Sequence, residues 1–268
     1  MSRSLKAGMT TVVLLTAILS VQALADEKKD DPERARILAQ VKQLLQDADS
    51  YKAIEFISKQ GEPLEVSKRY SDLVNDFYWK EKALPHVVTL ARAGIHYSLI
   101  KSQELVDSDL LKANEVRDVA RVISYNLASY TWPGWDEEGI VITEGDLAVG
   151  LEAAKLNLRL VEELELGLMS QSMANWGLGA MHMALRQYDE AISAFESSME
   201  DALLDEAREF ELMNLGYIGI AKILNGSTRD EGQTQLDEAV AELEKLGTED
   251  SDHFLGQLKT SLKVFARD

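Results

Sequence analysis

Residues 175–195 read NWGLGAMHMALRQYDEAISAF, and this stretch decides the fold. Its apolar residues recur at helical spacing and predict two helices joined by a short turn near residue 188. Gly179 and Ala191 are small, which lets two helices cross closely, and Phe195 fills the space beside them. The stretch therefore predicts a tightly packed pair of antiparallel helices.

The same residues resemble a tetratricopeptide repeat (TPR). That motif has a Leu-Gly step in its first helix, an Ala twelve residues beyond the Gly and an aromatic residue four positions later. Leu178, Gly179, Ala191 and Phe195 match it in type and spacing. The resemblance implies a right-handed α-solenoid of stacked antiparallel helix pairs.

Two neighbouring segments extend this pattern. Downstream, Ile218-Gly219 is followed by Gly232, Leu236 and Ala239, and upstream Ala154 stands at the equivalent small position. The small positions Ala154, Ala191 and Gly232 are spaced more widely than the ~34 residues of the family. We therefore expect degenerate repeats with insertions over residues 110–268.

The rest of the sequence after residue 30 also has patterns typical of helices. Three of the four prolines stand where a helix would begin. We expect an N-terminal helical region over 26–109 and a C-terminal capping helix. The single apolar stripe of the capping helix runs from Phe254 to Phe265. The expected helices run over 31–47, 50–60, 63–80, 85–104, 110–130, 145–164, 169–187, 189–201, 205–225, 229–246 and 251–267. A generic all-α bundle is the alternative.

The N-terminus has the pattern of a secretory signal peptide over residues 1–25. Arg3 and Lys6 precede an apolar run from Met9 to Val21, and Ala23-Leu24-Ala25 supplies the small residues of a cleavage site directly before a charged stretch. The apolar run is shorter than the ~20 residues of a membrane-spanning helix. We therefore expect an exported protein, periplasmic or secreted, with an uncleaved anchor as the alternative.

Composition excludes several classes of partner and site. The chain has no cysteine, so disulfides, thiolate metal sites and cysteine nucleophiles are absent. Its formal net charge of −18 opposes binding to nucleic acid and to anionic membrane surfaces. After signal cleavage we expect neither nucleic-acid binding nor membrane insertion.

An insertion over 131–144 separates two of the expected helices and contains Trp132 and Trp135. Large aromatic residues in a loop indicate either a binding element or a plug that fills the side of the solenoid. We favour the plug, with Asp136, Glu137 and Glu138 in water. These acids lack the alternating spacing of a calcium loop, so no metal site is expected.

The repeat resemblance also implies a concave face on which a protein or peptide partner lies. The residues that the repeat register places there are Met173, Trp176, Ala180, Met183, Met213 and Ile220. This face would be apolar, rich in methionine and rimmed by acids, which suits a basic or amphipathic partner. The alternative is that this stripe belongs to the core.

Catalytic motifs are absent from the sequence. His86, His96, His182 and His253 show no metal-ligand spacing, and no nucleophile elbow, phosphate-binding loop or dinucleotide fingerprint is present. We therefore predict a binding scaffold with no catalytic residue and no cofactor. A structural subunit of a cell-envelope complex is the first alternative, and an enzyme with an unrecognised site is the second.

Overall fold

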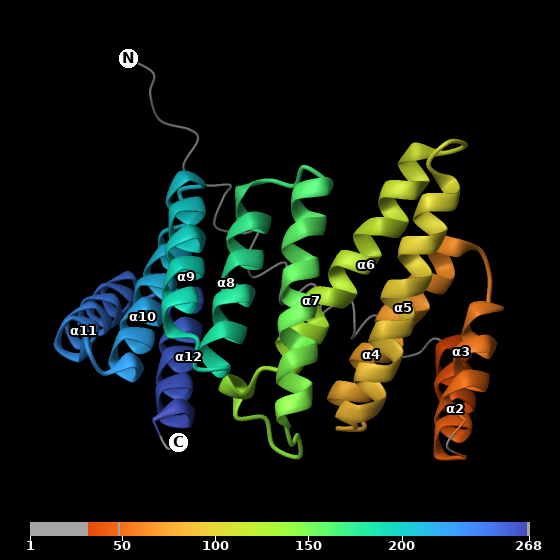
Figure 1. The fold of residues 1–268 in the computed structure, drawn as a ribbon, viewed down its shortest axis with the longest axis horizontal. Coiled ribbons are helices and arrows are strands. Elements are labelled where there is room, and N and C mark those ends of the chain that lie inside the picture. Colours follow the sequence, from red (N-terminus) through yellow and green to blue (C-terminus); the bar gives the residue numbers. More distant parts are fainter. Residues whose placement is uncertain (1–31, 48, 267–268) are drawn as a thin grey trace.

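The computed structural model describes residues 32–47 and 49–266, which form helices and no strand. Successive helices pack as antiparallel neighbours, and all but the last lie in one row (Figure 1), so the predicted all-α, solenoid-like fold is confirmed. The expected signal peptide lies outside the described residues. No described helix combines the length and the apolar character that a membrane crossing needs. The bounds of the eleven described α-helices and one 3-10 helix are α2 Pro32–Gln46, α3 Ser50–Ser58, α4 Pro63–Trp79, α5 Leu84–Leu105, α6 Leu110–Tyr130, η1 Pro133–Trp135, α7 Glu144–Glu163, α8 Leu168–Ala184, α9 Tyr188–Leu204, α10 Arg208–Asn225, α11 Arg229–Leu246 and α12 Glu249–Phe265.

Side chains cap several of these helices at their first turn. Asp49 and Asp109 each accept the backbone N–H three residues later, at 2.9 and 3.0 Å. Thr143 and Thr248 form reciprocal capping boxes at the starts of α7 and α12. Each cap satisfies N–H groups that lack a partner within the helix and contributes about 1 kcal/mol.

The turns after α7, α8 and α9 share one geometry. Glu165, Arg186 and Glu206 follow these helices in the left-handed conformation, with φ of 51°, 60° and 59°. In each turn the next residue donates its N–H to the carbonyl five residues back, at 2.9 or 3.0 Å. This is the Schellman arrangement, which usually has glycine at the left-handed position. It reverses the chain within a few residues and sets each helix beside the previous one.

Small residues allow the paired helices to approach closely. A Cβ added at Gly179 on α8 would lie 2.7 Å from the Phe195 ring on α9. A Cβ added at Gly219 on α10 would lie 2.7 Å from the carbonyl oxygen of Gly232 and 2.8 Å from the amide nitrogen of Leu236, both on α11. The expected small-residue crossings are therefore present in both helix pairs.

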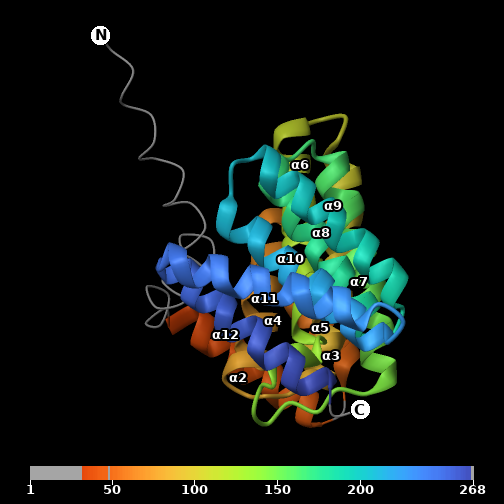
Figure 2. The same cartoon turned by 90° about the vertical axis from the view of Figure 1, so that its left-hand side faces the viewer.

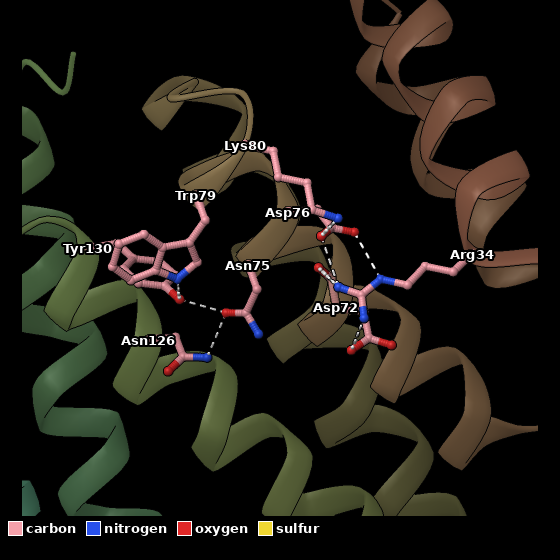
Figure 3. A network of polar contacts seen from close by, with 8 residues as sticks. All are labelled: Arg34, Asp72, Asn75, Asp76, Trp79, Lys80, Asn126 and Tyr130. Carbon is pink, nitrogen blue, oxygen red and sulfur yellow. Dashed lines mark hydrogen bonds and ion pairs between the residues drawn. The ribbon is translucent and has the colours of Figure 1, made fainter. Parts of the chain in front are cut away.

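A polar network joins the N-terminal helices to the rest of the array (Figure 3). The Tyr130 hydroxyl on α6 donates to Asn75 Oδ1 on α4 at 2.6 Å and accepts the indole N–H of Trp79 at 3.1 Å. Asn126 donates to the same Asn75 oxygen at 3.2 Å. The ring of Tyr130 also stacks on Tyr78, with centroids 3.8 Å apart. These contacts fix the crossing of α4 and α6.

The other half of this network holds α2 on α4. Asp76 is 3 % exposed and accepts two hydrogen bonds from the Arg34 guanidinium, at 2.9 and 3.0 Å. Lys80 forms a second ion pair with Asp76 at 2.7 Å. A buried carboxylate is stable only where such partners replace its hydration, so this pairing positions α2 specifically.

Candidate functional site

The residues predicted on the concave face lie on α8 and α10, but they are covered. We call the side of α6, α8 and α10 that α12 and η1 cover the inner face. Trp176, Ala180 and Met183 on α8 and Met213 and Ile220 on α10 are each at most 4 % exposed, and Met173 is half-buried. These side chains form part of the core, which is the alternative that the sequence left open.

The insertion brings its two tryptophans onto these helices. Trp132 is 2 % exposed, and its ring centroid lies 4.8 Å from that of Trp135, 5.6 Å from that of Trp176 and 6.0 Å from that of Tyr217. Trp135 is half-buried and donates its indole N–H to the Ser129 carbonyl at 2.9 Å. The insertion thus fills the inner face as a plug.

The C-terminal helix completes this cover. α12 packs against α10, α11 and η1, and it lies next to α11 in the view of Figure 2. Its Phe265 ring lies 6.2 Å from that of Trp132. A partner cannot reach buried residues such as Trp176 and Met213 in this arrangement, because two segments of the same chain occupy that space.

Two of the three acids of the insertion form ion pairs while their side chains remain partly exposed to water. Asp136 pairs with Lys263 of α12 at 3.1 Å, and Glu137 pairs with Lys82 in the α4–α5 turn. Lys82 also lies 5.3 Å from the Trp79 ring centroid. The insertion is therefore tied on one side to the N-terminal helices and on the other to α12.

Little space remains beneath the plug. The indole N–H groups of Trp132 and Trp176 are buried without a protein acceptor, and both rings border an internal cavity of about 10 Å³. That volume accommodates about one water. The inner face offers no room there for a peptide or a cofactor.

An open groove lies elsewhere, between α3, α4 and α5. Its volume is about 770 Å³, within the range of ligand-binding pockets. We call it the α5 groove, and it is lined by Ile54, Ser58, Tyr70, Val88, Thr89, Arg92, Ala93, His96, Tyr97, Ile100 and Lys101. Most of these residues are on one face of α5, which α3 covers only in part.

Apolar and aromatic side chains form the floor of the α5 groove. The rings of Tyr70 and Tyr97 lie 5.9 Å apart, and Ile100 is 43 % exposed. The Tyr70 hydroxyl donates to the Ile54 carbonyl at 3.1 Å, which fixes α3 over α4. Burial raises the pKa of Tyr70 and of Tyr97, so both phenols are neutral at physiological pH.

The α5 groove is lined by two basic side chains and a histidine, and by no acidic side chain. Arg92 and His96 are one helical turn apart on α5, and Lys101 lies further along with Glu104 as a partner at 2.6 Å. In a chain with 46 acidic and 28 basic residues, this lining differs in sign from the whole molecule.

Arg92 is also unusual in having no partner. Seven described arginines make a side-chain hydrogen bond or an ion pair. The other three arginines in the described part of the chain, Arg92, Arg186 and Arg229, make neither kind of contact. Arg92 lines the α5 groove, and the other two line a second hollow that includes Met183.

Within 32–47 and 49–266, no three acidic or histidine side chains are grouped so that they could hold a metal ion. His182 Nδ1 lies 2.7 Å from Gln187 Oε1, an interaction within the α8–α9 turn. His86 packs edge-on against Phe77, with centroids 5.6 Å apart.

The α5 groove was not predicted from the sequence, although part of its signal was present. Val88 and Tyr97 belong to two apolar rows at helical spacing in residues 85–105, a pattern typical of a helix that is contacted from two directions. The structure buries Val87, Leu90 and Ala91 but leaves Val88 and Tyr97 partly open. A sequence pattern shows that a row is apolar and does not show whether another helix covers it.

Comparison with known proteins gives no relative. The chain matches no protein-family model, and no curated protein is similar to it in sequence.

Proposed function

We propose that this chain is an exported scaffold of TPR-like helix pairs that binds an amphipathic, acidic segment of a partner protein in the α5 groove. The observation that carries the proposal is the groove itself, an open apolar channel whose unpaired Arg92 lies in an otherwise acidic protein. From Val88 to Lys101 the α5 helix extends for about 20 Å, enough to contact several turns of a partner helix.

The site differs from the one that the repeat resemblance implied. The chain's own η1 and α12 cover the inner face, whereas the α5 groove is open over side chains such as Ile100. The basic lining favours a partner with acidic residues beside its apolar stripe. An amphipathic helix docks in this way by placing its apolar face in the groove and its charges at the rim.

Two observations support the finer parts of the proposal. The TPR-like assignment is supported by the match at Leu178, Gly179, Ala191 and Phe195 and by the close approach of Gly179 to Phe195. Export is supported by the pattern of residues 1–25. Mass spectrometry of the mature N-terminus tests export, and a chain that begins at Met1 in the cell interior would contradict it.

Site-specific photo-crosslinking tests the binding function. A photo-reactive residue at Thr89 would lie in the groove, and one at Val141, which is 80 % exposed in the insertion, serves as the matched control. We expect a defined partner to be cross-linked from position 89 and not from position 141. The purified partner segment is then titrated against the parent and against Ile100→Asp.

The Ile100→Asp variant introduces a charge at an exposed position and should fold normally. We expect it to bind the partner segment at least tenfold more weakly, because it buries an unpaired carboxylate against the partner's apolar face. Equal affinity for the parent and for this variant would refute the α5 groove as the binding site.

A structural role in an envelope complex is the second candidate, favoured by a different surface. Leu110 and Leu111 at the α5–α6 turn and Leu203 and Leu204 at the α9–α10 turn are 58 to 80 % exposed. Both turns lie along the same edge of the array (Figure 1). Co-purification at fixed stoichiometry that is lost in Leu111→Ser/Leu204→Ser, but kept in Ile100→Asp, would favour this function.

A further inference from the structure

The second hollow lies at one end of the inner face, beyond the plug. Its volume is about 510 Å³, and it is the place where the ends of α8, α10 and α12 meet the insertion and the start of α7. Most of the residues that line it are apolar, with Ile142, Leu147, Met183, Leu224 and Phe265 among them, and polar atoms contribute about half of its exposed surface. We call it the arginine pocket, because the charged residues that line it are Arg186 and Arg229.

Neither arginine has a partner within the described chain. Arg186 lies in the α8–α9 turn, and Arg229 is the first residue of α11. Tyr188, the first residue of α9, also lines the pocket, as do residues in the last turns of α8, α10 and α12. The positive starts of two helices are therefore opposed by the negative ends of three, and the positive charge of the pocket comes from the two guanidinium groups.

Acidic residues in the first turns of α9 and α11 have other partners or lie outside the lining. Asp189 accepts a hydrogen bond from Asn225 at 3.1 Å, and Glu231 pairs with Lys222. Glu190 and Asp230 are exposed and do not line the pocket. The two guanidinium groups consequently remain available to an anion.

We propose that the arginine pocket binds a small single-tailed carboxylate, an aliphatic acid whose tail occupies the apolar walls and whose head group pairs with Arg186 and Arg229. A guanidinium group presents its N–H donors in a fork that matches a carboxylate. The apolar walls bind the aliphatic tail, since each methylene that they bury contributes about 0.8 kcal/mol of transfer free energy. This ligand class and this pocket are independent of the α5 groove and of a peptide partner.

Calorimetric titration of the mature protein with dodecanoate, below its micelle concentration, tests the proposal. We expect saturable binding at one site. Acetate, which lacks the tail, and dodecyltrimethylammonium, which carries the opposite charge, should not bind at that site. Decanoate should bind about tenfold more weakly than dodecanoate, because it buries two fewer methylenes.

The variants separate this pocket from other surfaces. We expect Arg186→Gln and Arg229→Gln each to weaken dodecanoate binding by about tenfold or more, since each removes a charge-assisted hydrogen bond. Arg92→Gln is the matched control, because Arg92 is also unpaired but lines the α5 groove, and it should leave the affinity unchanged. Ile142→Trp places a larger side chain in the pocket and should abolish binding with both arginines intact.

Three results would overturn the proposal. They are the absence of saturable dodecanoate binding by the parent, equal binding by the Arg186→Gln/Arg229→Gln double variant, and equal binding of the cationic amphiphile. Thermal melting of each variant establishes that it is folded before it is titrated. The arginine variants alter exposed side chains, so they remain a valid test even where Ile142→Trp disturbs packing.

Discussion

Replacing Gly219 by alanine should destabilise the protein, because it forces α10 away from α11. The added Cβ would meet two backbone atoms of α11, the Gly232 carbonyl oxygen at 2.7 Å and the Leu236 amide nitrogen at 2.8 Å. Backbone atoms cannot rotate away as the end of a side chain can. The overpacking therefore costs about 3 kcal/mol, the upper part of the usual range.

Helix propensity acts in the opposite direction and sets the net effect. Alanine is favoured over glycine inside a helix by about 1 kcal/mol, which leaves Gly219→Ala less stable by about 2 kcal/mol. For a chain of this size the melting temperature should fall by about 4–8 °C. Differential scanning calorimetry of the mature protein measures the change directly.

Gly177 supplies the matched control on the neighbouring helix α8. A Cβ added at Gly177 meets no heavy atom within 4 Å, so Gly177→Ala gains the helix propensity without overpacking. We expect its melting temperature to rise by about 2–4 °C. The reasoning is refuted if Gly219→Ala melts at or above the parent, or if both substitutions lower the melting temperature equally.

Three further predictions concern the plug, the turns and the buried tyrosines. Trp132→Ala should reduce the free energy of unfolding by about 3–5 kcal/mol, because it removes the ring at the centre of the aromatic cluster. Urea unfolding measures this change, and a loss below about 1 kcal/mol would show that the plug contributes little to stability. Glu206→Gly should raise stability by about 0.5–1 kcal/mol, since φ is 59° at this position and glycine adopts it without strain; a lower melting temperature would contradict this. Burial raises the pKa of Tyr125 to about 12 and also raises that of Tyr217, so the unfolded chain loses these protons first and stability should fall as pH rises from about 10 to 12. Melting temperatures that stay constant over that interval would exclude this linkage.

The helices were predictable from the sequence because their signals are local. All eleven expected helices are present, and caps such as Asp109 and Thr143 stand at the starts of their helices. The largest boundary differences are three residues, at the end of α9, at the start of α10 and at the end of α8, which was expected to reach residue 187 and ends at Ala184. It ends there because Arg186 adopts the left-handed conformation, and an arginine gives no sequence signal for that turn.

The candidate site was harder to predict because it depends on contacts between distant segments. Met183 and Trp176 form an apolar stripe whether a partner or the same chain covers it. The cover comes from η1 and α12, which are far from α8 in the sequence. The open surface was missed for the same reason, since Arg92 resembles any exposed arginine until the surrounding helices are placed.

The contact between α12 and η1 has a consequence for cooperativity. In a simple solenoid each repeat touches its neighbours alone, so the ends can fray while the middle stays folded. Here the Asp136–Lys263 pair and the packing of Phe265 on Trp132 close a loop of more than a hundred residues. The last repeat cannot open without releasing the centre of the array, so amide hydrogens of α10 should exchange together with those of α6 in one global unfolding event. Loop closure over this distance also raises the contact order, and the chain should fold more slowly than a linear array of equal length.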